Sequence, residues 1–113
     1  MSENANVKII DSTQFDAEVL KAAGPVVLDF FSTDCAPCEA LAPKFEAMAD
    51  KYGDRVRFLK IFRQGSRELA TKLGVSSSPT LVFFKAGQEV GERLMGDDIQ
   101  RSALKAQLEA LLA

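Results

Sequence analysis

The segment Val26–Phe31 limits the possible folds of this 113-residue chain more than any other feature of its sequence. All of its residues except Asp29 are apolar, so both alternating faces of an extended strand would be hydrophobic. A strand of this kind needs apolar cover on both sides, which is typical of the centre of a sheet flanked by helices. The sequence therefore predicts a central strand that carries one carboxyl group into the interior.

Helical and extended hydrophobic patterns alternate along the rest of the chain. The order β-α-β-α-β-α-β-β-α predicts an α/β fold with a central mixed β-sheet of about five strands and four flanking helices. The sheet is expected to start parallel and to end in an antiparallel C-terminal hairpin. We expect a single domain over residues 1–113. Besides the central strand, the predicted strands are 7–10, 56–62, 80–84 and 89–94, and the predicted helices are 13–23, 35–52, 66–73 and one that begins after Asp97.

Capping residues and helix breakers indicate where these helices begin and bend. Ser12 is expected to cap the first helix, and Ser66 the third. Asp97 and Gln100, three residues apart, resemble a capping box in front of the last helix. Pro43 lies inside the second helix, where its missing backbone N–H group predicts a kink.

Charge and N-terminal composition exclude several classes of partner. The net charge of −2 gives no basic field for nucleic acid or an anionic membrane, so we expect neither as a partner. No apolar run approaches the roughly 20 residues of a membrane-spanning helix. The first six residues have neither the basic segment nor the apolar core of a signal peptide, so we expect a cytoplasmic protein.

Histidine is absent from the chain, and its two cysteines, Cys35 and Cys38, lie three positions apart. The absence of histidine excludes the usual His-assisted serine and cysteine hydrolases. A purely structural disulfide is not expected in the reducing cytoplasm, so the pair indicates a role other than covalent stabilisation of the fold.

The cysteine pair lies where a buried strand is followed by a helix, and this position predicts redox chemistry. Side chains three positions apart on a helix share a face, about 5–6 Å from each other, which suits a disulfide. A loop this short constrains the unfolded chain little, which favours a bond that is made and broken. The helix N-terminus favours a thiolate at Cys35, which would attack a substrate disulfide. Cys38, one turn deeper, would resolve the mixed disulfide, and Pro37 would hold the turn between them.

Two alternatives to redox chemistry stay open for the cysteine pair on the residues alone. The first is a pair of buried, inert thiols. The second is a metal site, but two thiolates are half of a tetrahedral zinc shell, and no histidine or further cysteine completes it. We therefore assign no metal ligand, and a copper carrier or a bridged cluster would require two copies of the chain.

Further residues match a known family along nearly the whole chain: the run 27–38, Leu41-Ala42-Pro43, Lys60, Ser78-Pro79-Thr80, Phe84-Lys85-Ala86-Gly87 and Gly96. With these residues the chain resembles thioredoxin. The resemblance implies the thioredoxin fold and a thiol–disulfide oxidoreductase that reduces protein disulfides, with the redox-active Cys35–Cys38 disulfide and no cofactor. It also implies disulfide-containing protein substrates, an electron donor that is a thioredoxin reductase or another dithiol, and a monomer.

The resemblance implies a role for each matching residue near the cysteines. Asp29 corresponds to a buried carboxyl group that takes the proton of Cys38, and Lys60 to a lysine that pairs with it. Taken alone, Asp29 fits a carboxyl group held by local hydrogen bonds equally well, and Lys60 fits a solvent-facing lysine. Pro79 corresponds to a cis-proline opposite the cysteines. The backbone of Ser78 would pair with an extended substrate segment, and Gly96 would belong to the neighbouring contact loop.

Several residues of the site depart from the family pattern. Asp34 and Phe31 stand where tryptophan is usual, Ala36 replaces glycine, Glu39 replaces a basic residue, Ser78 an apolar one and Gln64 an acidic one. Asp34, Ala36 and Pro37 are still expected to contact the substrate. Negative charge at Asp34 and Glu39 disfavours a thiolate, which predicts a reducing and partner-selective thioredoxin. The alternative is a thioredoxin-fold binding or chaperone subunit whose cysteines react slowly.

Overall fold

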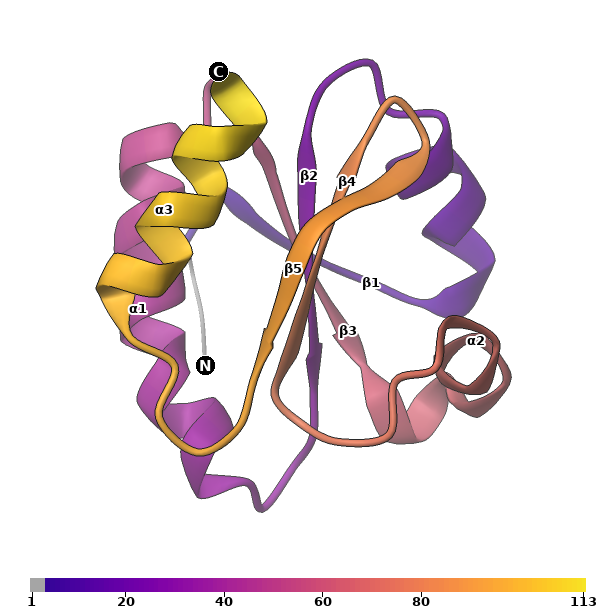
Figure 1. Cartoon of the computed structure of the whole chain (residues 1–113). Helices are drawn as coiled ribbons and strands as arrows, with labels where there is room; N and C mark the ends of the chain where they lie inside the picture. The colour runs from indigo at the N-terminus through magenta and orange to yellow at the C-terminus, as the bar shows by residue number, and fades with distance from the viewer. Residues whose placement is uncertain (1–3) are drawn as a thin grey trace.

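The strands of this computed structural model form one five-stranded sheet, and the structure describes residues 4–113 (Figure 1). The order across the sheet is β1-β3-β2-β4-β5. The first three strands of the chain are parallel, and β4 and β5 run antiparallel to their neighbours. This confirms the predicted mixed sheet and its C-terminal hairpin. The strands are β1 (Val7–Ile10), β2 (Val26–Phe31), β3 (Arg57–Phe62), β4 (Thr80–Lys85) and β5 (Gln88–Met95).

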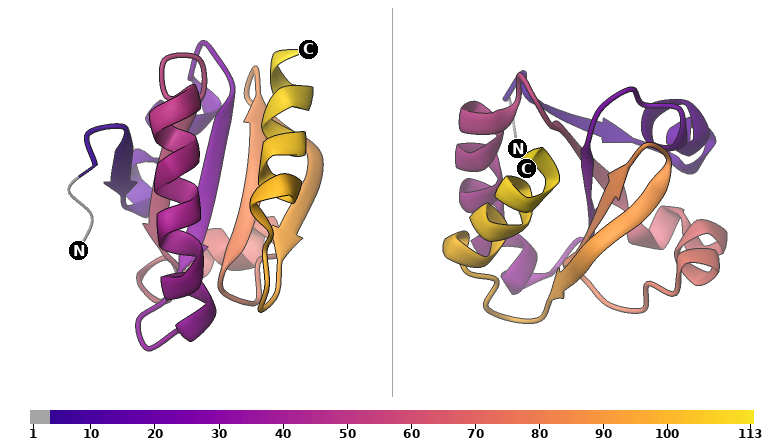
Figure 2. Two further views of the ribbon diagram at one scale, coloured as in Figure 1. Left: turned by 90° about the vertical axis from the view of Figure 1, so that its left-hand side faces the viewer. Right: turned by 45° about the horizontal axis from the view of Figure 1, so that its top comes forward.

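Helices cover both faces of the sheet (Figures 1 and 2). α1 (Ala36–Tyr52) and α3 (Arg101–Leu112) lie side by side on one face. α2 (Arg67–Leu73) and the N-terminal turns η1 (Ser12–Gln14) and η2 (Asp16–Leu20) lie on the other. Among the described residues no helix combines the length and apolar character needed to cross a bilayer.

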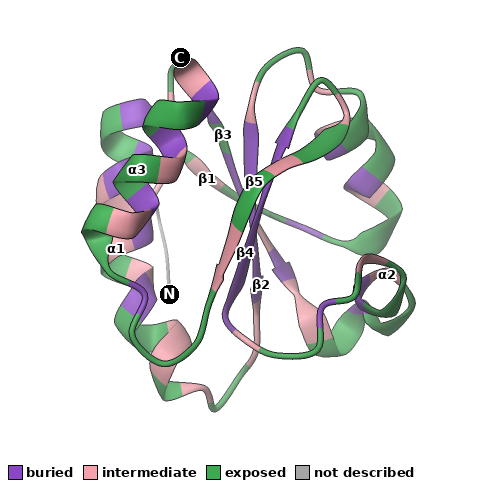
Figure 3. Ribbon diagram, viewed as in Figure 1, coloured by how far each residue is buried: buried purple, intermediate pink, exposed green. Residues whose placement is uncertain are grey.

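The central strand divides its side chains between two apolar cores, as its sequence predicts. Val27 points into the core beneath α1 and α3, together with Phe45, Phe58 and Leu108. Leu28 and Phe30 belong to the second core, beneath α2 and the N-terminal turns. Figure 3 shows the central strands as the most continuously buried part of the sheet. Burial on both faces fixes the register of β2 and with it the position of everything that follows its last residue.

The first predicted helix, 13–23, is present but ends earlier than predicted, and the prediction of Ser12 as its cap is wrong. The chain forms a single 3₁₀ turn and then a π-helical segment that ends at Leu20. Asp11, in an extended conformation, is the N-cap, because its carboxylate accepts a hydrogen bond from the backbone N–H of Thr13 at 2.9 Å. A charged oxygen is the stronger acceptor, and the Gln14 side chain completes a capping box by accepting from the Asp11 N–H at 3.0 Å.

The predicted capping box of Asp97 and Gln100 is also wrong. α3 begins at Arg101, and its N-cap Gln100 makes no side-chain capping bond. Packing holds this end of the helix instead: Ile99 is buried against the core, and Lys44 Nζ donates a hydrogen bond to its carbonyl oxygen at 3.0 Å.

The predicted boundaries of the other two helices are close to those observed. Cys35 is the N-cap of α1, and Pro43 lies within this helix, where a kink stays a prediction. Ser66 occupies the N-cap of α2 as predicted, although its side chain makes no capping bond. Gly74 ends α2 with a φ of +72°, a left-handed conformation that favours glycine.

Candidate functional site

The cysteine pair follows the carboxyl end of β2, where the chain turns into α1. Cys35 and Cys38 form a disulfide, and their Cα atoms are 5.2 Å apart. Cys35 is the N-cap of α1, and its Sγ accepts a hydrogen bond from the backbone N–H of Cys38 at 3.2 Å. This N–H group belongs to the first helical turn and has no carbonyl partner within the helix. Because it points at the Cys35 sulfur, it stabilises negative charge on that atom.

Three loops meet at this end of the sheet, the lower end in Figure 1. The Ser78–Pro79 peptide bond is cis, which confirms that part of the expectation for Pro79. The carbonyl oxygen of Ser78 lies 3.7 Å from Cys35 Sγ. Gly96 follows β5, whose Met95 pairs with Thr80 in register, so Gly96 lies near the cis-proline. Gly96 has a φ of +106° and open space around it.

The other residues predicted to contact substrate flank the disulfide. Asp34 is exposed and has a φ of +52° immediately before Cys35. Ala36 is exposed and Pro37 is half-buried in the first turn of α1. Glu39 is exposed in the same turn, so exposed carboxylates both precede and follow the cysteine pair in the sequence.

Asp29 lies in the middle of β2 and is 2% exposed. Its Oδ1 has no hydrogen-bond partner within the described part of the chain. Burial disfavours the charged carboxylate and raises the pKa of Asp29 to about 7, and the positive charge of Lys60 opposes this rise. A carboxyl group with this pKa exchanges protons near neutral pH.

Lys60 is the register neighbour of Asp29 on β3. Across residues 4–113 no hydrogen bond or ion pair joins the two side chains, and Lys60 Nζ instead lies 4.9 Å from the centre of the Phe31 ring. The expected pairing with Asp29 is therefore electrostatic at a distance. A surface hollow of about 360 Å³ brings solvent to Lys60, Phe31 and Cys38 together.

Sequence reasoning missed a polar cluster around Ser78. The hydroxyl groups of Ser78 and Ser32 share a hydrogen bond at 2.6 Å. Arg63 Nε donates to the same Ser78 oxygen at 2.8 Å. Next to it, Gln64 Oε1 accepts from the backbone N–H of Thr33 at 3.3 Å. The replacement of an apolar residue by Ser78 was the available signal, because a half-buried hydroxyl needs a polar partner.

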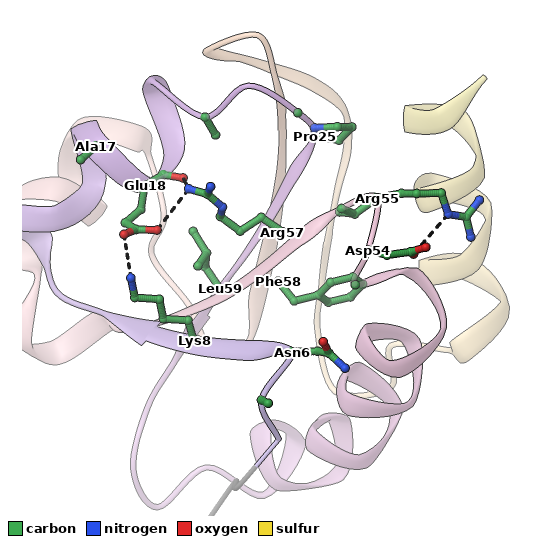
Figure 4. Close-up of a pocket in the computed structure, with 15 residues that line it drawn as sticks. Asn6, Lys8, Ala17, Glu18, Pro25, Asp54, Arg55, Arg57, Phe58 and Leu59 are labelled. Carbon is green, nitrogen blue, oxygen red and sulfur yellow. Dashed lines mark hydrogen bonds and ion pairs between the residues drawn. The ribbon is translucent and has the colours of Figure 1, made fainter.

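Another surface hollow, of about 720 Å³, lies at the other end of the sheet and is separate from this site (Figure 4). Its charged side chains are engaged with one another: Glu18 binds Lys8 at 2.7 Å and Arg57 at 3.1 Å, and Arg55 lies 3.5 Å from Asp54. Within residues 4–113 no three potential metal-binding side chains gather at one place.

Comparisons with known proteins agree with the fold and the site. The Thioredoxin family model matches residues 6–110. The thioredoxin of Peptoclostridium acidaminophilum is 41% identical over 99 residues, which cover 88% of this chain and 89% of that protein. The thioredoxin of Acetoanaerobium sticklandii is 38% identical over 103 residues, with coverage of 91% and 93%.

A solved structure shares the arrangement of elements. The thioredoxin Mala s 13 of Malassezia sympodialis superposes with a TM-score of 0.83 at 35% identity, covering 95% of this chain and 91% of that one. Thioredoxins act on disulfide substrates and are reduced by thioredoxin reductase. With its dithiol pair at the end of a buried strand and its cis-proline opposite, this chain belongs to the thioredoxin family of dithiol–disulfide oxidoreductases.

Proposed function

We propose that this protein reduces disulfides of partner proteins, with Cys35 as the nucleophile and Cys38 as the resolving thiol. The position of Cys35 carries this assignment: it is the N-cap of α1, next to the Ser78 carbonyl. The Cys35 thiolate attacks one sulfur of the partner disulfide, and the other partner sulfur leaves as a thiolate. The Cys38 thiolate then attacks Cys35 Sγ, which forms the Cys35–Cys38 disulfide and releases the second partner thiol. The partner gains the two electrons that the Cys35–Cys38 dithiol loses. A thioredoxin reductase or another dithiol then reduces the Cys35–Cys38 disulfide again.

Asp29 takes the proton of Cys38 in the second step. Its buried, unpartnered Oδ1 and its pKa of about 7 support this role. Lys60 adjusts the charge balance of that carboxyl group from the neighbouring strand. The hollow that reaches Cys38 and Lys60 supplies water for the proton to leave.

The substrate segment lies extended along the cis-proline loop. The backbone of Ser78 pairs with it in the manner of an added strand, while Asp34, Ala36, Pro37 and Gly96 flank the disulfide under attack. Pro79 holds the Ser78 carbonyl at this position. The protein acts in the cytoplasm as a monomer and needs neither a metal nor a cofactor.

Trapping with Cys38→Ser tests the division of labour between the cysteines. The variant is expected to accumulate mixed disulfides through Cys35, because the attack proceeds and the resolving thiol is missing. Non-reducing electrophoresis of a lysate passed over the immobilised variant measures the yield, and a reducing lane is the control. Equal trapping by Cys35→Ser would contradict the assignment of nucleophile and resolver.

The acidic residues beside the disulfide predict a reducing and partner-selective thioredoxin. Asp34 and Glu39 disfavour the Cys35 thiolate and so favour the disulfide, which lowers the reduction potential. Both carboxylates are exposed, so the expected effect is modest.

Equilibration against glutathione measures this potential. We expect a value at or below the roughly −270 mV of thioredoxin, and a rise of about 10–20 mV in the double variant Asp34→Asn/Glu39→Gln. The matched control removes two exposed carboxylates at the opposite end of the sheet, in Asp16→Asn/Asp54→Asn. A wild-type potential well above that of thioredoxin contradicts the reducing character, and rapid insulin reduction with an ordinary thioredoxin reductase contradicts the selectivity.

A further inference from the structure

Arg63 lies against the cis-proline loop, and none of the carboxylates within residues 4–113 pairs with it. It is the first residue of the turn η3 (Arg63–Gly65), directly after β3, and it is half-buried. Only its Nε is engaged, in the hydrogen bond to Ser78 Oγ. In the described chain its two terminal nitrogens have no hydrogen-bond partner, and it forms no ion pair.

Ser78 links this guanidinium to the attacking sulfur. Its hydroxyl accepts from Arg63 and shares a second hydrogen bond with Ser32, so the Arg63 side chain is held on the cis-proline loop. The carbonyl oxygen of the same residue lies 3.7 Å from Cys35 Sγ. A partner that reaches Cys35 along this loop therefore passes the Arg63 guanidinium.

A hollow of about 470 Å³ opens next to Arg63, between α2 and the loop that leads to Ser78. Arg63 and Arg67 both line it, together with polar side chains such as Thr71 and Ser76. No carboxylate belongs to its wall among the described residues. An acidic side chain would enter this hollow and pair with a planar guanidinium that is already positioned.

We propose that Arg63 is a specificity-determining residue that binds an aspartate or glutamate of the partner beside the disulfide under attack. The inference rests on the proposed reduction of partner disulfides and names the substrate class. Glu39 stands in the first turn of α1, whereas Arg63 begins the turn η3 and Arg67 begins α2. The site thus presents a carboxylate on α1 and two guanidinium groups at η3 and α2, and a partner with an acidic residue facing Arg63 is selected over one with a basic residue there.

Peptides that carry one cysteine as a mixed disulfide with uncharged 2-thiopyridine test the proposal. The three peptides are identical except that glutamate, glutamine or lysine flanks the cysteine on the side that faces Arg63 in the extended binding mode, with a second set for the opposite flank. Cys35 attacks the peptide sulfur, and released 2-thiopyridone reports the rate in stopped flow with reduced protein. We expect the glutamate peptide to react at least about fivefold faster than the lysine peptide at low ionic strength, and salt to reduce the ratio.

Three variants assign the preference to Arg63. Arg63→Gln is expected to bring the glutamate-to-lysine ratio close to one, and because the ratio is taken within one variant, a general change in rate cancels. Arg63→Lys retains part of the preference, because the charge stays and the planar two-nitrogen contact is lost. Arg55→Gln, with the same loss of charge at the opposite end of the sheet, keeps the full ratio.

The outcomes separate this inference from the proposed function. No thiopyridone release from any peptide contradicts the attack by Cys35 itself. Release at equal rates from all three peptides in both sets overturns the role of Arg63 and leaves the reductase function standing. An equal loss of preference in Arg55→Gln and Arg63→Gln also overturns it, because net charge would then be the cause.

Discussion

Replacing Asp29 with asparagine is expected to remove a pH-dependent contribution to the free energy of unfolding of the oxidised protein. Across the titration of Asp29 this contribution changes by up to about 4 kcal/mol. The pKa of Asp29 is raised from 3.8 to about 7 in the folded protein, chiefly by burial. Between these values the folded state holds a proton that the unfolded state has lost. The free energy of unfolding of the wild type therefore falls as pH rises from about 4 through about 7, relative to the variant.

Urea unfolding of both oxidised proteins over this pH range measures the effect. The difference in free energy of unfolding, variant minus wild type, is expected to grow with pH and to level off above about pH 8. Asp98→Asn is the matched control, because it removes an exposed carboxylate, and its difference from the wild type should stay nearly constant. Parallel curves for Asp29→Asn and the wild type would show that folding does not raise the pKa of Asp29.

Replacing Cys35 with serine is expected to abolish disulfide reduction, with a loss of about 10³-fold or more. A serine hydroxyl stays protonated near neutral pH, so no nucleophile faces the partner disulfide. Cys38→Ser keeps the attacking thiolate and loses turnover only after the first attack. Insulin reduction driven by a dithiol donor measures turnover, and a single-turnover assay separates the two variants. Attack in Cys35→Ser at a rate near that of Cys38→Ser would contradict the assignment.

The sequence predicts the sheet well because its strands depend on local patterns. Val26–Phe31 is apolar on both faces, and the structure buries it between two cores. The start of α1 at the cysteine pair follows equally from neighbouring residues, since Cys35 caps the helix that contains Cys38. Predictions of this kind need only side-chain periodicity and the properties of helix ends.

Local sequence patterns do not predict helix boundaries and side-chain positions that depend on contacts between residues far apart in the sequence. Ile99 anchors the start of α3 through the core and Lys44, so a local capping motif predicted the wrong boundary. Lys60 is aligned with Asp29 along the sheet, but its side chain extends over Phe31. Arg63 reaches Ser78 across 15 positions, and no periodic pattern carries that information.

The hydroxyl group of Ser78 is hydrogen-bonded to both Ser32 and Arg63. The effects of substitutions at these three positions on stability are therefore not additive. Substituting an apolar residue for Ser78 alone removes the acceptor of Arg63 Nε and the partner of the Ser32 hydroxyl. Each loss leaves a half-buried polar group without a partner, so single exchanges cost more than the joint exchange of all three. An evolutionary path between this polar loop and an apolar one therefore favours coordinated substitutions at 32, 63 and 78 over stepwise ones.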